Sequence, residues 1–80
     1  MKLPRDVAAR CLGRALAKLG IVAHGKKGSH MRFTTESGGQ HHVTLPNADP
    51  IRVGTLHGIL KDIAAHHHIT VEELVQKLEL

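Results

Sequence analysis

Eighty residues are enough for one domain with a single modest core and too few for two domains. The chain has no Trp or Tyr and only one Phe, so its core has to be built from aliphatic side chains. A formal charge of +4 with neutral histidines favours an anionic partner. The basic residues gather in two stretches, 5–18 and 26–32, a clustering that is more typical of nucleic-acid binding than an even distribution.

The single cysteine, Cys11, cannot form an internal disulfide, as is usual for proteins of the reducing cytosol. It falls within an apolar helical pattern, and we expect it to be a small core residue. The opening residues contain no apolar signal segment, and no apolar run approaches the ~18 residues of a membrane span. We therefore expect a soluble, cytoplasmic protein that has no contact with a membrane.

The pattern over residues 4–19 predicts a helix. Pro4 suits the first turn, Asp6 suits the positive end of the helix dipole, and Gly20 is well placed to end the helix. One face is apolar at helical spacing: Val7, Cys11, Leu12, Ala15, Leu16 and Leu19. Another face carries a basic ridge: Arg10, Arg14 and Lys18. We interpret this ridge as a solvated surface rather than a dedicated RNA contact.

Three β-rich runs follow at residues 21–24, 30–35 and 40–45, separated by turn signals at 25–29 and 36–39. The last two runs are predicted to form an antiparallel hairpin. Alternation places the apolar residues on one side: Met31, Phe33, Val43 and Leu45. The polar residues are on the other side: His30, Arg32, Thr34, His42 and Thr44. The predicted sheet therefore has an apolar face for helices and an open, polar, histidine-bearing face.

After a loop at residues 47–53 that contains Pro50, a second helix is predicted from Thr55. Its apolar residues recur at helical spacing: Leu56, Ile59, Leu60, Ile63 and Ala64. Thr70 and Glu73 form a capping box that starts a short last helix. Residues 1–80 are thus predicted to be a single α+β domain of α-β-β-β-α order, with a three-stranded antiparallel sheet, helices on one face and an additional C-terminal helix.

The most informative stretch is Lys26-Lys27-Gly28-Ser29-His30, with Arg32 two positions further on. A turn that carries Lys, Gly and Ser offers backbone N–H groups and positive charge to a phosphate. His30 supplies a side chain that exchanges protons near neutral pH. A phosphate-binding turn beside a proton carrier is what RNA cleavage by transesterification requires. We assign His30 as the catalytic candidate and, as RNA-binding candidates, Lys26, Lys27, Gly28, Ser29 and Arg32.

RNA carries its own nucleophile, the 2′-hydroxyl, so a metal-free nuclease needs a general base, a general acid and cations that stabilise the charge on phosphorus. His30 can serve as the base or the acid. His42 lies on the same side of the neighbouring predicted strand and is a weak candidate for the second group. An enzyme with one histidine agrees equally well with the sequence.

The histidine runs at 41–42 and 66–68 raise the question of a metal site. Adjacent helical residues point ~100° apart, so His66, His67 and His68 cannot all bind one ion while the helix is intact. His41 and His42 face opposite sides of a strand. A zinc site that uses one residue from each run is the less favoured hypothesis, and we assign no metal ligand and no cofactor.

Several short pieces of the sequence occur together in one order: Lys27-Gly28-Ser29-His30 with Arg32-Phe33, then Val43-Thr44-Leu45-Pro46, then Gly54-Thr55-Leu56 with Ile59-Leu60-Lys61, and more loosely Thr70-Val71-Glu72-Glu73-Leu74 and the opening Met1-Lys2-Leu3-Pro4-Arg5-Asp6. In these pieces the chain resembles the HicA-type toxins of bacterial and archaeal toxin–antitoxin pairs. These are small ribonucleases with a fold similar to the double-stranded-RNA-binding domain. The sequence departs from the family pattern at His57, where a basic residue is usual, and in a longer link between the last two helices at residues 65–68.

The resemblance implies the toxin of a type II pair, an endoribonuclease that cleaves mRNA with His30 as its catalytic residue. It also implies a HicB-type antitoxin that covers the active site. We expect this activity to be independent of metal ions. Two alternatives stay open: a non-catalytic RNA-binding module of the same fold, and a protein-interaction domain whose open sheet face pairs with a partner.

Overall fold

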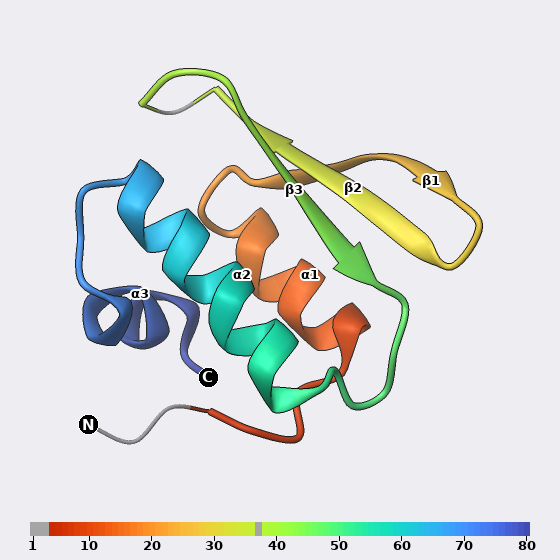
Figure 1. Ribbon diagram of the computed structural model, residues 1–80. Helices are drawn as coiled ribbons and strands as arrows, with labels where there is room; N and C mark the ends of the chain where they lie inside the picture. Colours follow the sequence, from red (N-terminus) through yellow and green to blue (C-terminus); the bar gives the residue numbers. More distant parts are fainter. Residues whose placement is uncertain (1–3, 37) are drawn as a thin grey trace.

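The computed structural model describes residues 4–36 and 38–80, apart from the side chain of Lys27. Its elements are, in chain order, α1 (Ala9–Ala17), β1 (Val22–Lys27), β2 (His30–Thr35), β3 (His41–Pro46), α2 (Val53–His66) and α3 (Val71–Leu78). The strands form one antiparallel sheet in the order β1-β2-β3. Figure 1 shows α1 and α2 side by side on one face of this sheet, with α3 packed against α2. The predicted α+β fold is confirmed.

The pairing of β2 with β3 gives the sheet its two faces. Phe33 pairs with Val43, and Met31 pairs with Leu45. Phe33, Val43 and Leu45 are buried under the helices, whereas Met31 is half-buried against the same core. His30, which is adjacent to Met31, is exposed on the opposite face. The predicted alternation is therefore confirmed, and the open face carries His30 rather than Phe33.

The two helices that cover the sheet bury the aliphatic side chains that their periodicity predicted. In α2 these are Leu56, Ile59, Leu60, Ile63 and Ala64. The helix begins at Val53, two residues before the predicted start, and ends at His66. The capping box of α3 is also confirmed: the Glu73 N–H donates to Thr70 Oγ1 at 3.0 Å, and the Thr70 N–H donates to Glu73 Oε1 at 3.2 Å.

Two predictions for the N-terminal helix are wrong. The helix α1 begins at Ala9 instead of Pro4, because Asp6 adopts a left-handed backbone conformation with φ of 58° that a right-handed helix cannot contain. Cys11 is exposed rather than buried. The buried stripe of α1 runs through Leu12, Ala15 and Leu16, and Cys11, one position before Leu12, points ~100° away from it.

The first strand is longer than predicted. Residues 25–29 were expected to form a turn, but β1 continues to Lys27, and only Gly28 and Ser29 lie outside the strands. Gly25 adopts φ of +105°, a conformation that lets the strand pass through a bulge instead of ending. Gly28, with φ of +60°, occupies the first position of the two-residue hairpin turn. Within the described residues, no helix is long and apolar enough to cross a membrane.

Candidate functional site

His30 lies at one corner of the open sheet face, directly after the hairpin turn. As the first residue of β2 it pairs with Lys27 on β1 and with Pro46 on β3. The Asn47 N–H donates to the Ser29 carbonyl oxygen at 2.6 Å, which ties the turn to the segment after β3. The backbone around His30 is therefore held from both sides, while its side chain stays accessible to a ligand.

Two shallow hollows meet at His30. The first, of about 640 Å³, is lined by His24, Gly25, Lys26, His30, Met31, Arg32 and Thr44. The second, of about 410 Å³, is lined by His30, Thr44, Pro46, Ala48, Arg52 and Thr55. Both have room for a phosphate with part of its sugar or base, and His30 and Thr44 line both of them.

The cations of the predicted site gather at the first hollow. Lys26 and Arg32 line it beside His30, and all three side chains are exposed. Among the residues that the structure describes, no carboxylate forms an ion pair with Lys26, Arg32 or Arg52. Their positive charge is therefore available to an anion. The side chain of Lys27, another predicted RNA-binding residue, lies outside the part of the chain that the structure describes.

The predicted RNA-binding residues Gly28 and Ser29 lie in a turn, as expected. They form the two-residue turn next to His30, and neither contributes to the described lining of the two hollows. The carbonyl of Ser29 is engaged by Asn47. Their position in the turn is observed, and donation of their N–H groups to a phosphate stays a prediction.

The basic ridge of α1 differs from this surface. Arg10 pairs with Asp49 at 2.8 Å, and Lys18 pairs with Glu79 at 3.1 Å. Both pairs are exposed, and their cations lie in α1 or at its C-cap, on the helix that covers the apolar face of the sheet. These contacts support the interpretation of the ridge as a solvated surface.

The strand register does not support His42 as the partner of His30. His42 pairs with Thr34, which is four residues along β2 from His30. At about 3.3 Å per residue, this is a separation of ~13 Å along the sheet, too long for both rings to reach one phosphate. The structure instead places His24 in the first hollow.

Sequence reasoning missed His24 because it ended the first strand there. The signal that could have revealed it is Gly25, since a glycine within a β-rich run often marks a bulge rather than a strand end. With the bulge in place, β1 continues alongside β2, and His24 becomes part of the open face.

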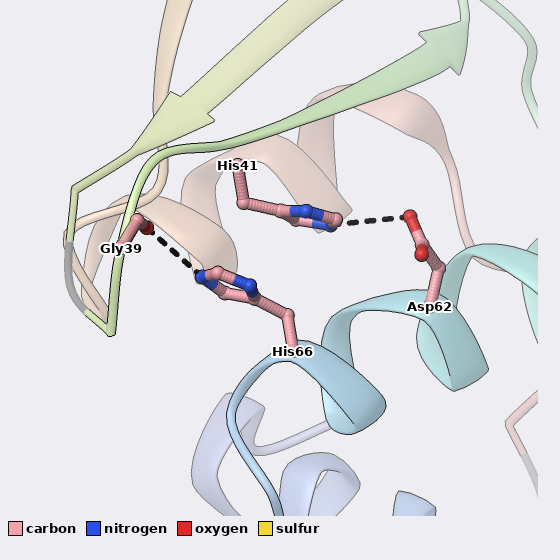
Figure 2. A network of polar contacts seen from close by, with 4 residues as sticks. All are labelled: Gly39, His41, Asp62 and His66. Carbon is pink, nitrogen blue, oxygen red and sulfur yellow. Dashed lines mark hydrogen bonds and ion pairs between the residues drawn. The ribbon is translucent and has the colours of Figure 1, made fainter.

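A second histidine cluster lies at the opposite end of β3 from His30 and joins this strand to α2. Figure 2 shows the rings of His41 and His66 stacked on each other, with centroids 4.3 Å apart and planes at 11°. His41 Nε2 donates to Asp62 Oδ2 at 3.2 Å, and His66 Nε2 donates to the Gly39 carbonyl at 3.0 Å. The ring of His67 meets that of His66 edge-on, with centroids 5.0 Å apart. These hydrogen bonds and ring contacts connect the end of the β2–β3 hairpin to the C-terminal part of α2.

The geometry of this cluster does not suit a metal ion. The lone pair of an imidazole nitrogen lies in the plane of its ring, so two parallel stacked rings cannot converge on one ion. Within the described ranges, no group of three or more His, Cys, Asp or Glu side chains is arranged to hold a metal. The observed contacts of His41 and His66 are structural.

We expect the free energy of unfolding to depend on pH through this cluster. Burial, followed by the neighbouring His66, His41 and His68, lowers the pKa of His67 below its ordinary value of 6.5. As the pH falls, His67 is therefore protonated in the unfolded chain before it is protonated in the folded protein. Its effect on the free energy of unfolding is absent above pH 6.5, and below that pH it destabilises the fold. The free energy of unfolding, measured in denaturant, is expected to fall between about pH 7.5 and 5.5, and less steeply for His67→Gln. The matched control is His68→Gln at the exposed neighbour; equal pH slopes for His67→Gln and wild type would contradict this role of His67.

The chain matches the family model described as HicA toxin of bacterial toxin–antitoxin over residues 9–64. The match runs from α1 through all three strands to α2, and it includes the hairpin that carries His30. The helix α3 and the residues from His66 to His68 lie beyond it. No curated protein and no solved structure matches the chain. Since the match covers well over half of its length, the chain belongs to the HicA family of toxins of bacterial toxin–antitoxin systems, a membership that implies a cognate antitoxin as its partner.

Proposed function

We propose that this toxin is an endoribonuclease that cleaves mRNA in the cytoplasm, with His30 as a catalytic acid or base. The observation that carries this proposal is the position of His30: it is exposed at the junction of two hollows, among cations that no described carboxylate neutralises. A proton carrier surrounded by available positive charge is suited to a phosphodiester substrate.

The reaction begins with the RNA itself. The 2′-oxygen attacks the adjacent phosphorus as its proton is removed, and the bond from phosphorus to the 5′-oxygen breaks as that oxygen is protonated. The products are a 2′,3′-cyclic phosphate and a free 5′-hydroxyl. His30 moves one of these two protons, a role that typically accelerates a reaction by about 10²–10⁴-fold.

The cations bind the substrate and stabilise the charge that develops on phosphorus. Arg32 lies two residues from His30 on the same face of β2, and Lys26 lines the same hollow. Arg52 lines the second hollow, on the other side of His30, just before α2 begins. A single strand of RNA that crosses His30 could thus place successive phosphates near Arg32 and Arg52, with the Lys26, Lys27, Gly28 and Ser29 hairpin alongside.

A HicB-type antitoxin that covers the open sheet face would block this surface. None of the described helices covers this face, and the face carries exposed positive charge, so an antitoxin with an acidic surface would compete directly with RNA. This mode of inhibition predicts that toxin bound to the antitoxin does not bind RNA.

The experiment that tests the function is an incubation of purified toxin with a single-stranded RNA in EDTA. Cleavage is expected to persist, because the 2′-hydroxyl is an internal nucleophile and needs no metal-activated water.

RNA binding is expected to weaken as the salt concentration rises. Arg32→Ala should reduce the slope of log affinity against log salt concentration by about 0.7, because one phosphate contact is lost. Arg14→Ala, which removes the same charge from an exposed site on α1, is the matched control and should leave the slope unchanged.

The alternatives give different results in this experiment. Salt-dependent binding without cleavage would support a non-catalytic RNA-binding module. Absence of RNA binding would contradict the proposed function and favour a domain that binds only proteins.

A further inference from the structure

We propose that His24 is the second proton-transfer group of RNA cleavage, acting on the same phosphodiester as His30. This inference rests on the proposed ribonuclease function. It assigns a role to a side chain that stands outside the Gly-Ser-His turn and that reaches the site only because of the irregular course of β1.

A bulge in β1 brings His24 to the site. Ala23 pairs with Phe33 and Lys26 pairs with Met31, so His24 and Gly25 together lie opposite the single residue Arg32. Two residues facing one define a β-bulge, and the positive φ of Gly25 permits it. The side chain of His24 thereby lines the first hollow together with Arg32 and His30.

The spacing suits one phosphodiester between the two rings. His30 is two residues from Arg32 along β2, so His24 and His30 are diagonal neighbours across the strand pair. Such neighbours are about 7–8 Å apart, with their Cβ atoms somewhat closer. Two imidazoles that lean toward each other over this gap can contact opposite sides of one phosphate. Arg32, which lies opposite His24 and two residues from His30, is then placed to bind the non-bridging oxygens.

The reaction includes two proton transfers, and a pair of imidazoles can carry out both. One imidazole, neutral at the start, takes the proton of the 2′-hydroxyl while the 2′-oxygen bonds to phosphorus. The other, protonated at the start, gives its proton to the 5′-oxygen while the bond from phosphorus to that oxygen breaks. One proton is taken up and one is released, so the pair exchanges its protonation states with no net change, and exchange with water resets it.

The other nearby side chains are less suitable. His42 is displaced along the sheet, and the His57 ring is held at 3.3 Å from the Pro4 carbonyl oxygen, where its Nε2 donates. Thr44 lines the hollow, but its hydroxyl does not change protonation near neutral pH. Among the described residues that line the first hollow, His24 and His30 are the two histidines.

The test compares His24→Ala with His42→Ala, which removes an exposed histidine from the same face outside the hollow. Single-turnover cleavage by His24→Ala is expected to be about 10²–10⁴-fold slower, with RNA affinity within a few-fold of wild type. The pH–rate profile should lose one of its two limbs, which a structural role of His24 would not cause. His42→Ala should match wild type in rate and in profile. Circular dichroism checks the fold, and His24→Asn serves as a second variant of similar polarity.

A substrate with sulfur in place of the bridging 5′-oxygen tests the proton transfer itself. A thiolate leaves without protonation because a thiol is far more acidic than an alcohol. This substrate should restore cleavage in whichever variant, at position 24 or position 30, lacks the acid, and not in the other. Rescue of neither variant would overturn the proposal.

The failure of this inference can be distinguished from the failure of the proposed function. If His24→Ala cleaves within a few-fold of wild type while His30→Ala is inactive, His24 has no catalytic role and the ribonuclease function stands. A slow His24→Ala enzyme with both limbs of the pH profile retained would also overturn the inference. If His30→Ala cleaves as wild type does, it is the proposed function that fails.

Discussion

Replacing His30 with alanine is expected to abolish RNA cleavage and growth arrest while leaving the fold and the RNA affinity close to those of wild type. Catalysis should fall by about 10²–10⁴-fold, because the variant loses a group that moves a proton in the transition state. Folding should be spared, because the side chain is exposed and its truncation creates no cavity. Surface changes of this kind usually alter stability by less than about 0.5 kcal/mol.

The measurement is single-turnover cleavage by wild type, His30→Ala and the control His42→Ala, which removes an exposed histidine from the same sheet face. Circular dichroism and an RNA-binding titration accompany it. A His30→Ala variant that cleaves RNA within a few-fold of wild type would remove His30 from the mechanism. A variant that fails to fold would show that His30 is structural.

The two faces of the sheet could be predicted because successive side chains of a strand point to opposite faces whatever the rest of the fold is. Alternation in the predicted runs 30–35 and 40–45 assigned Phe33 and Val43 to the core and His30 to the open face, and the structure has them there. The aliphatic spacing of α2 and the capping box at Thr70 were equally local signals. Each of these features depends on residues only a few positions apart in the chain.

The errors occur where a glycine or the unusual backbone of one residue changes the course of the chain. Gly25 was interpreted as the end of a strand, whereas it permits a bulge that lets β1 continue. Asp6 was placed in the first turn of a helix, whereas its positive φ keeps it outside α1. A turn residue and a bulge residue have the same local preferences, so pairing with β2 decides between them.

The candidate site likewise contains residues that a local motif predicted and a residue that only the folded structure brings there. The local motif of Lys26, Ser29, His30 and Arg32 was apparent in the sequence, and the structure brings three of these residues to one hollow. The place of His24 was missed, because Gly25 alone does not distinguish a bulge from a strand end and the register beyond it decides. The stacking of His41 on His66 joins residues far apart in the sequence and was equally inaccessible.

The most direct test of the central claim is cleavage of an RNA whose cut position has been mapped, compared with the same RNA carrying one 2′-deoxynucleotide immediately 5′ to that cut. In EDTA, wild-type toxin should cleave the unmodified RNA to a 2′,3′-cyclic phosphate and a 5′-hydroxyl, and should leave the substituted linkage intact. The loss should be complete at that linkage, because the attacking oxygen is missing, while binding changes little. Cleavage of the deoxy-substituted linkage at the rate of the unmodified one would contradict a transesterification catalysed at His30.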